Sequence, residues 1–228
     1  MYAFENPWHV VILVVLIAAT RVFFSLTQVM RAHRPAILEL IDSLLIAVLL
    51  VFCILRPFVI QAFYIPSDSM VPTLVKGDRL LVNKFIYYFQ DPKVGDIVVF
   101  DAPKQALNND NLPFKKDYIK RVVGVPGDRL MVKNEMLYRN GAPAREPFIN
   151  EEPRYTWPDD NAAETEITVP PGHIVVMGDN RNNSNDSHLW VDIEPDGSRV
   201  GNPFLPRANI RGKAMMIFLP PSRARLLK

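Results

Sequence analysis

Two serines and one lysine in this chain are spaced so that they could perform nucleophilic chemistry together. Ser67 and Ser69 lie in the segment Ile-Pro-Ser-Asp-Ser-Met-Val-Pro-Thr-Leu, and Lys120 follows about 50 residues later. A serine hydroxyl is a weak nucleophile at neutral pH and needs a base that takes its proton during attack. Lysine can be that base only when neutral, so its pKa must fall from about 10.4 to about 7, as an apolar, water-poor pocket allows.

Ser67 could assist the attack, because residues two apart in an extended segment point to the same side. If Ser69 attacks a carbonyl, its backbone N–H and the Ser67 hydroxyl could both donate to the developing oxyanion. The alternative is an ordinary serine-rich turn before Met-Val-Pro. The segment directly follows an apolar stretch of membrane length, which favours a nucleophile held at the bilayer surface.

The segment 118–123 has the alternation of a β-strand, which puts Lys120 on one face and Arg121 on the other. One of the two basic side chains must therefore face inward or into a groove. Alternation does not decide which one, and a solvated lysine is the ordinary alternative.

A third segment, 177–187, follows a predicted strand and is dense in Asn, Asp and Ser. Such side chains usually hydrogen-bond to nearby backbone and make a tight loop. A tight loop is also a rigid platform, so this segment could present Ser184 or an ion pair to a site.

Two apolar runs near the N-terminus predict transmembrane helices at about 8–24 and 40–58. The connection between them is basic, so by the positive-inside tendency it faces the cytoplasm and the chain after Phe63 lies outside. A cleavable signal is the alternative for the first run, but no Ala-x-Ala site follows it. Cys53, the single cysteine, falls in the second run, so the exported part can form no disulfide.

After Tyr64 the chain changes to short β-rich pieces separated by Pro, Gly, Asn and Asp, which predicts an all-β, mainly antiparallel domain. Turn signals occur at 126–128, 134–135 and 140–141. Two polar stretches, 104–116 and 145–163, lack periodicity and predict exposed loops or a small insertion. The candidate strands are 79–85, 97–100, 118–125, 129–133, 136–138, 167–169, 174–177 and 212–218.

Charge and composition argue against several functions. A net charge of +2 is too small to indicate nucleic-acid binding. The chain has no His-Glu-x-x-His motif, no cysteine pair and only four histidines, which argues against a zinc enzyme. The basic C-terminal tail of Arg223, Arg225 and Lys228 predicts a solvated end, with lipid contact as the alternative.

Taken together, the segments 65–74, 118–128 and 178–187 resemble the serine, lysine and final boxes of bacterial type I signal peptidase, the leader peptidase of the export pathway. The later segment 209–214 is similar to the closing strand of that family. The resemblance extends over the apolar anchor and all three boxes in order.

The resemblance implies that Ser69 is the nucleophile, Lys120 the general base, Ser67 an oxyanion donor and Ser184 the hydroxyl that orients the lysine. It also implies a structural ion pair between Arg121 and Asp179. Apolar walls would select small residues, typically Ala, at the first and third positions before the scissile bond. By the resemblance these walls are Phe63, Ile65, Pro66, Met70, Leu74, Tyr118 and Ile119.

The implied organisation is a membrane anchor over residues 1–63 and an extracytoplasmic catalytic β domain over 64–228, with a reduced accessory insertion at about 134–172. The enzyme would be a multi-pass protein of the plasma membrane that needs no cofactor and no metal. Its implied partners are the signal peptides of exported preproteins and the lipid bilayer, with the secretion translocon as a further candidate.

Some positions depart from the common pattern of the family. Asp68 replaces a frequent glycine, Asn182 replaces an Asp, and His188 stands where an arginine usually pairs with Asp186, which leaves that second pair open. An additional Pro-Asp-Gly stretch after Trp190 predicts a lengthened hairpin.

Two rival functions follow from the same residues. His173 and His188 lie beyond the membrane segments and Asp186 is close to the second, so a Ser-His-Asp hydrolase is the first alternative. The second is a membrane-tethered accessory domain that only binds. Such a domain would need neither Ser69 nor Lys120, so the presence of both argues against it.

Overall fold

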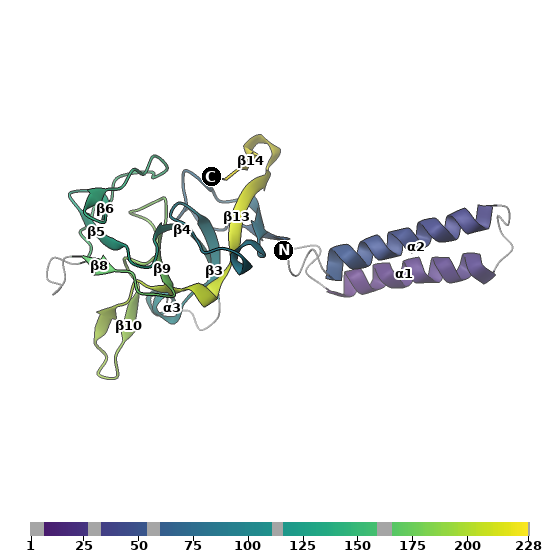
Figure 1. The fold of residues 1–228 in the computed structure, drawn as a ribbon, viewed down its shortest axis with the longest axis horizontal. Coiled ribbons are helices and arrows are strands. Elements are labelled where there is room, and N and C mark those ends of the chain that lie inside the picture. The colour runs from purple at the N-terminus through teal and green to yellow at the C-terminus, as the bar shows by residue number, and fades with distance from the viewer. Residues whose placement is uncertain (1–6, 27–32, 54–59, 111–115, 159–165, 228) are drawn as a thin grey trace. The chain divides into compact units, whose positions relative to one another are not determined.

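The computed structural model describes residues 7–26, 33–53, 60–110, 116–158 and 166–227. The chain forms two compact units, residues 1–60 and 61–228. Figure 1 shows two helices in the first unit and a β-rich body in the second.

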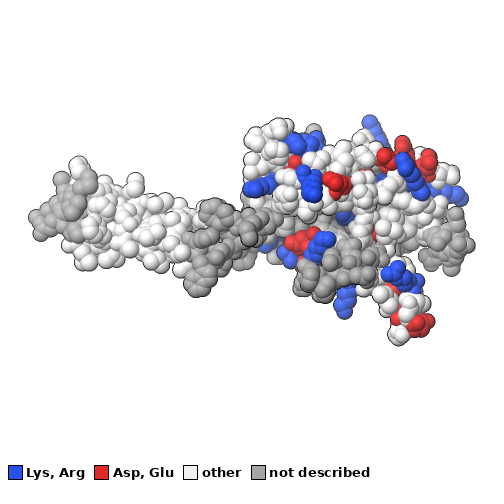
Figure 2. Space-filling model, turned by 180° about the vertical axis from the view of Figure 1, so that it is seen from behind, with Lys and Arg blue, Asp and Glu red and all other residues white. Residues whose placement is uncertain are grey.

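The first unit contains α1 (Pro7–Leu26) and α2 (Arg34–Leu50), which lie side by side (Figure 1). The Arg21 guanidinium and the Asp42 carboxylate form an ion pair between the two helices. In Figure 2 the described surface of this unit is almost entirely uncharged on the face shown. An apolar surface of this kind is expected of helices that contact lipid rather than water.

One described helical stretch, Pro35–Cys53, is long and apolar enough to cross a membrane, judged by length and composition. The α1 helix covers the whole of the first predicted span. The second helix begins at Arg34, earlier than predicted, because Pro35 at its first turn favours helix initiation there. Residues 54–58 of the second predicted span lie outside the described residues.

The second unit is built on an eight-stranded sheet in the order β1-β2-β13-β3-β4-β9-β12, with β14 paired to β13. The pairs among β2, β13, β14, β3, β4, β9 and β12 are antiparallel, as the sequence predicts. The strands are β1 (Ile60–Tyr64), β2 (Arg79–Asn83), β3 (Ile97–Asp101), β4 (Asp117–Gly124), β9 (His173–Met177), β12 (Leu205–Pro206), β13 (Ile210–Leu219) and β14 (Arg225–Leu226).

Apolar residues pack on both faces of this sheet. On β3, Val98 and Phe100 join one buried cluster, while Ile97 and Val99 join another. Alternation of side chains along a strand produces this division, since successive residues point to opposite faces. The central strands are therefore buried on both sides, which is what allows β4 to carry polar groups away from water.

A smaller sheet in the order β7-β6-β5-β8 lies beside the main one (Figure 1). Its hairpins turn at 134–135 and 140–141, where the three non-glycine residues adopt positive φ, between 50° and 61°, as two-residue hairpin turns require. Both predicted turns are confirmed. The strands are β5 (Arg129–Lys133), β6 (Met136–Arg139), β7 (Ala142–Pro143) and β8 (Ile167–Thr168).

The predicted lengthened hairpin after Trp190 is confirmed as β10 (Val191–Ile193) and β11 (Arg199–Gly201). The short 3-10 helices are Ile86–Tyr88, Arg207–Asn209 and Pro221–Arg223.

The structure adds three local features to these predictions. The segment 104–116 is not only a loop, because α3 (Lys104–Asp110) forms there and buries Ala106. The end of the second apolar run forms the strand β1, since residues 60–64 alternate between half-buried and exposed and pair with β2. The described part of the segment 145–163, residues 145–158, is only partly exposed, because Trp157 pairs with Val132 and packs into the core.

Candidate active site

Ser69 lies in a tight loop that connects β1 and β2. The loop is closed at its base by the hydrogen bond from Ile65 N–H to the Asp78 carbonyl at 2.9 Å, and within it Leu74 N–H donates to the Met70 carbonyl at 2.9 Å. Met70 and Leu74 are fully buried and anchor the loop in the core. Residues 66–68 of the loop, which include Ser67 and Asp68, are exposed.

Lys120 comes from β4 and contacts the loop serine directly. Its Nζ donates a hydrogen bond to Ser69 Oγ at 2.7 Å, although the two residues are 51 positions apart. The lysine is 4% exposed, and its Nζ also lies 5.6 Å from the centre of the Tyr118 ring. An aromatic face attracts a cation. Removal of the amine from water has the opposite effect and disfavours its charged form.

Alternation along β4 predicted that one of the two basic side chains is inward. Both are buried, because both faces of the sheet are covered: Arg121 is 3% exposed. The two residues nevertheless point to opposite sides, Lys120 to the serine and Arg121 to Asp179.

Ser67 Oγ lies 3.5 Å from Ser69 Oγ, at the limit of a hydrogen bond. The two hydroxyls therefore share one side of the loop, as their spacing predicts. A group bound at Ser69 would be within reach of the Ser67 hydroxyl.

A cavity of about 460 Å³ opens in front of Ser69 and Lys120. Three of the predicted wall residues line it, namely Pro66, Tyr118 and Ile119. Ile65, Met70 and Leu74 do not, because their side chains are the apolar anchors of the loop and point into the core. Phe63 packs, partly buried, against the same cluster.

The cavity also has polar walls, which no sequence pattern predicts. They are Asp68, Lys116, Asp117, Asn183 and Asn185. Asn183 and Asn185 flank Ser184 in the third segment, and Lys116 and Asp117 directly precede Tyr118. Only their closeness in sequence to predicted site residues could have indicated that they line the cavity.

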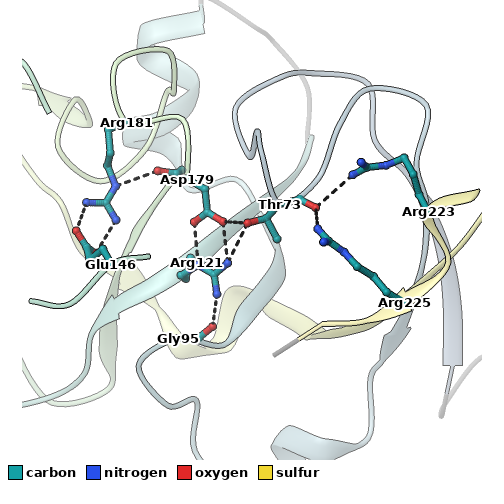
Figure 3. A network of polar contacts seen from close by, with 9 residues as sticks. Thr73, Gly95, Arg121, Glu146, Asp179, Arg181, Arg223 and Arg225 are labelled. Carbon is teal, nitrogen blue, oxygen red and sulfur yellow. Dashed lines mark hydrogen bonds and ion pairs between the residues drawn. The ribbon is translucent and has the colours of Figure 1, made fainter. Parts of the chain in front are cut away.

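Arg121 and Asp179 form a bidentate ion pair, with Nε and Nη2 at 2.8 and 2.7 Å from the two carboxylate oxygens (Figure 3). Asp179 is fully buried. Arg121 also donates to the Gly95 carbonyl at 2.9 Å and lies 3.8 Å from the centre of the Phe148 ring. A buried pair with this many partners has fixed geometry, because moving either charge would leave the other uncompensated.

The pair is connected to the serine loop through Thr73. The Thr73 hydroxyl donates to Asp179, and Arg121 Nη2 approaches the same hydroxyl at 3.4 Å (Figure 3). The residue after Asp179, Asn180, donates its backbone N–H to the Ser69 carbonyl at 3.1 Å. Asp179 and Asn180 thus hold the loop at two points.

A second buried pair supports the third segment from the insertion side. Arg181 makes two hydrogen bonds to Glu146, at 2.6 and 2.7 Å, and its Nε donates to the Gly178 carbonyl at 3.0 Å. Burial opposes the charge of Arg181, but the Glu146 carboxylate more than offsets this and raises the pKa of the guanidinium. The two residues are 35 positions apart, and no local sequence pattern predicts their pairing.

Ser184 is buried beside the serine loop, and Gly178 lies between them. A Cβ atom on Gly178 would stand 2.3 Å from Ser184 Oγ and 2.4 Å from the Ser69 carbonyl oxygen, so only glycine fits. Ser184 Oγ has no hydrogen-bond partner of normal geometry in the described part of the chain, although it is close enough to Asp186 to help lower the pKa of that carboxyl. Its predicted role in orienting Lys120 stays a prediction.

His188 takes the place of the arginine usual in the family and does pair with Asp186, with Nδ1 at 2.7 Å from the carboxylate. Asp186 also accepts the Gly178 N–H at 2.7 Å. Burial alone would raise the pKa of Asp186, but His188 and the Gly178 N–H hold it below its usual range. The imidazole stacks on the Tyr155 ring at 4.1 Å.

Among the described residues, no three His, Cys, Asp or Glu side chains are grouped so that they could hold a metal ion. A serine hydroxyl bonded to a buried amine, at the wall of a cavity, is the arrangement that a serine peptidase with a lysine base requires. The fold and the site thus define a β protein of the serine hydrolase type that begins with apolar helices.

Comparison with known proteins identifies the family. The sequence pattern of the family described as signal peptidase, peptidase S26, matches residues 37–219. The chain is 44% identical over 180 residues to a probable signal peptidase I-1 of Synechocystis sp., covering 79% of this chain and 82% of that protein. It is 40% identical to a signal peptidase I of Leptolyngbya laminosa, with coverages of 85% and 84%. It is 36% identical to the signal peptidase I of Pseudomonas aeruginosa, with coverages of 75% and 69%. The chain belongs to the signal peptidase family, peptidase S26.

Proposed function

We propose that this protein is a membrane-bound serine endopeptidase that removes signal peptides from exported preproteins, cleaving after small residues through an acyl-enzyme. The observation that carries the proposal is the 2.7 Å contact between Lys120 Nζ and Ser69 Oγ at the wall of a cavity. Family membership supplies the substrate class, because relatives that match most of the chain bear the name signal peptidase I.

In the first half of the reaction, Ser69 Oγ attacks the scissile carbonyl carbon while neutral Lys120 takes the hydroxyl proton. The tetrahedral oxyanion accepts hydrogen bonds from the Ser69 backbone N–H and the Ser67 hydroxyl, each such donor being worth about 3 kcal/mol. Collapse of the intermediate breaks the C–N bond, and Lys120 passes its proton to the leaving amine. The mature protein leaves, and the signal peptide stays esterified to Ser69.

In the second half, Lys120 takes a proton from a water molecule that attacks the ester carbonyl. The second tetrahedral intermediate then collapses, the Ser69 oxygen recovers the proton from Lys120, and the signal peptide leaves with a new carboxyl terminus. One base serves both steps, so each step needs the amine uncharged at its start. The 4% exposure of Lys120 supports this, since a buried amine is less easily charged than a solvated one.

The substrate preference is proposed from the walls of the cavity. Tyr118, Ile119 and Pro66 present apolar surface close to the catalytic pair, which favours small apolar side chains before the scissile bond. Met70, Leu74 and Ile65 would influence this preference only from behind, by supporting the loop.

We further propose that both N-terminal helices span the membrane and that residues 61–228 lie on its extracytoplasmic face. Support comes from the length and apolar surface of Pro35–Cys53, from the 20 residues of α1, and from the basic residues Arg31 and His33 between the two helices and Arg34 at the start of α2. The plasma membrane is where a preprotein tethered by its signal peptide would meet the enzyme.

The Ser-His-Asp alternative is not favoured. His188 and Asp186 do form a pair, but the imidazole stacks on Tyr155, whereas Ser69 Oγ is bonded to Lys120. A purely binding role would give no reason for a buried lysine beside a serine hydroxyl.

The test is cleavage of a preprotein with an Ala-x-Ala site by the purified full-length protein in detergent. Ser69→Ala and Lys120→Ala should each lower the rate by at least about a thousandfold, since members of one catalytic unit fail together. The exposed Arg199→Met serves as a control that should cleave at the wild-type rate. Normal processing by either site variant would remove that residue from its proposed role.

The pH dependence provides an independent measurement. The rate should rise with pH as the amine of Lys120 loses its proton, and a flat profile between about pH 5 and 9 would contradict a lysine base. Replacing His173 and His188 with Gln should leave this rise in place. Abolished cleavage in that double variant would instead favour a histidine base.

A further inference from the structure

The basic C-terminal tail is largely exposed, as the sequence predicts, but its arginines are bound to the rest of the domain. After β13 the chain turns through the 3-10 helix Pro221–Arg223, and β14 pairs back on β13 through Met216 and Ile217. Figure 3 shows that Arg223 and Arg225 from this returning arm both point at Thr73 in the serine loop. Lys228 lies outside the described residues.

Both arginines contact the same backbone atom. Arg225 Nη2 donates to the Thr73 carbonyl at 2.7 Å, and Arg223 Nη2 approaches that oxygen at 3.5 Å. Thr73 is four residues after Ser69, and its hydroxyl is already bonded to Asp179. This one residue is therefore held by its side chain from the third segment and by its carbonyl from the C-terminal arm.

Arg223 holds the same loop at a second place. Its Nε and Nη2 lie 2.8 and 3.0 Å from the two oxygens of Asp78, which is fully buried. The Asp78 carboxylate in turn accepts the Val75 N–H at 3.0 Å, and the Asp78 carbonyl closes the base of the loop at Ile65. The C-terminal arm thus contacts the serine loop at Thr73 and at Asp78, the residue that closes the base of the loop.

We propose that Arg225, assisted by Arg223, is a positioning residue for catalysis: the C-terminal arm clamps the loop through the Thr73 carbonyl and so holds Ser69 Oγ against Lys120. The kinetic part of this inference rests on the proposed function. A displacement of about 1 Å in a reacting group can lower a rate by about a hundredfold, so a loop that carries the nucleophile needs fixing from more than one side.

The surroundings of Arg225 allow its hydrogen bond to Thr73 to be removed without disturbing the folding of the domain. A second cavity, of about 390 Å³, borders Thr73 and Arg225 together with Phe148, Leu226 and Leu227. Arg225 itself is exposed. A methionine at position 225 would therefore keep the aliphatic length and fill no space needed by the core, while it removes the hydrogen bond.

The experiment compares Arg225→Met, Arg225→Lys and the matched exposed control Arg199→Met in the full-length protein. Arg225→Met should lower kcat by about tenfold, since a hydrogen bond from a charged donor is lost, and should change KM by less than about twofold. Arg225→Lys should recover part of the loss because it keeps a charged donor. The control should match the wild type in both constants.

Two further readouts distinguish positioning from general damage. The loss of kcat should be the same factor at every pH, because arginine stays charged throughout the range. Hydrogen exchange measured on the peptide 73–78 should quicken in Arg225→Met, because the amides of Leu74, Val75, Gly77 and Asp78 are all hydrogen-bonded within the loop. The melting temperature of Arg225→Met should stay within about 3 °C of that of the wild type, as for other surface substitutions.

The two proposals fail in different ways. Unchanged kcat in Arg225→Met, or unchanged exchange in 73–78, overturns the clamp even if the protein processes preproteins normally. A wild-type protein that cleaves no preprotein overturns the proposed function, and the exchange measurement alone then decides the clamp. Equal losses in Arg225→Met and Arg199→Met would also overturn it, because the effect would then come from surface charge.

Discussion

Charged side chains are buried around the serine loop but exposed on the β10–β11 hairpin. Around the loop, Arg121, Asp179, Arg181 and Asp186 are at most 3% exposed, and each has a charged or backbone partner at hydrogen-bond distance. On the hairpin, residues 194–200 are all exposed (Figure 2).

The difference shows what buried charge does in this fold. Burying ions costs free energy and adds little net stability, but a buried pair tolerates few alternative geometries. The loop needs a single geometry because Ser69 must stay within reach of Lys120. No hairpin residue lines the cavity at Ser69 and Lys120, so the charged side chains of the hairpin can stay exposed to water.

The largest expected effect comes from breaking the buried pair. Asp179→Ala should lower the melting temperature by about 10 °C, because Arg121 would remain as an uncompensated buried charge. Scanning calorimetry of the detergent-solubilised protein measures this. The control is Glu194→Ala on the hairpin, which should melt like the wild type, and equal shifts in the two variants would erase the proposed contrast.

Gly178→Ala should be next in size and should act on activity more than on stability. Its Cβ would push the Ser69 carbonyl and Ser184 apart, so we expect a rate loss of about a hundredfold in preprotein cleavage. Gly201→Ala on β11 is the matched control, because a Cβ there meets nothing within 4 Å. If the two alanine variants cleave equally well, the close packing at Gly178 has no catalytic importance.

A smaller effect should appear only in one pH range. The pKa of Asp186 is held below its usual value, so its contribution to stability is complete above about pH 4 and is lost as the pH falls through the lowered pKa. The melting temperature of Asp186→Asn should therefore lie below that of the wild type near pH 7, and the gap should close toward pH 3. A gap independent of pH would mean that the charge of Asp186 does not matter.

The smallest effect is expected from the hairpin itself. Replacing residues 194–198 with Asn-Gly, which suits a two-residue hairpin turn, should leave the cleavage rate within about twofold of the wild type. The same preprotein assay measures it. A tenfold loss would show that the hairpin takes part in substrate handling and would remove the contrast between the two regions.

Much of the fold and of the site follows from local sequence patterns. The eight predicted strands all occur, because alternation and turn residues act over a few positions. The errors fall where tertiary contacts override the local pattern: the polar segment 104–110 becomes a helix because Ala106 and Gln105 pack inward, and Gln105 donates to the Phe204 carbonyl from a distant part of the chain.

The substrate walls show the same limit within the site. Met70 and Leu74 are apolar residues next to the nucleophile, which made them reasonable wall residues. In the structure both are buried in the apolar cluster beneath the loop, while Asn183, Asn185 and Asp117 line the cavity, so the wall role of Met70 and Leu74 stays a prediction. Nothing in local spacing distinguishes an apolar residue that faces a substrate from one that anchors a loop.

The amino-acid sequence by itself determined the apolar N-terminal helices, the antiparallel β character and the identity of the residues able to perform the chemistry, because these depend on composition and short-range periodicity. Only the tertiary structure decided that Lys120 Nζ meets Ser69 Oγ and that Thr73 is held from three directions, by Asp179, Arg223 and Arg225. It also put His188 on Tyr155. These contacts join residues between 33 and 152 positions apart, and local sequence patterns, which act over a few positions, do not determine such pairings.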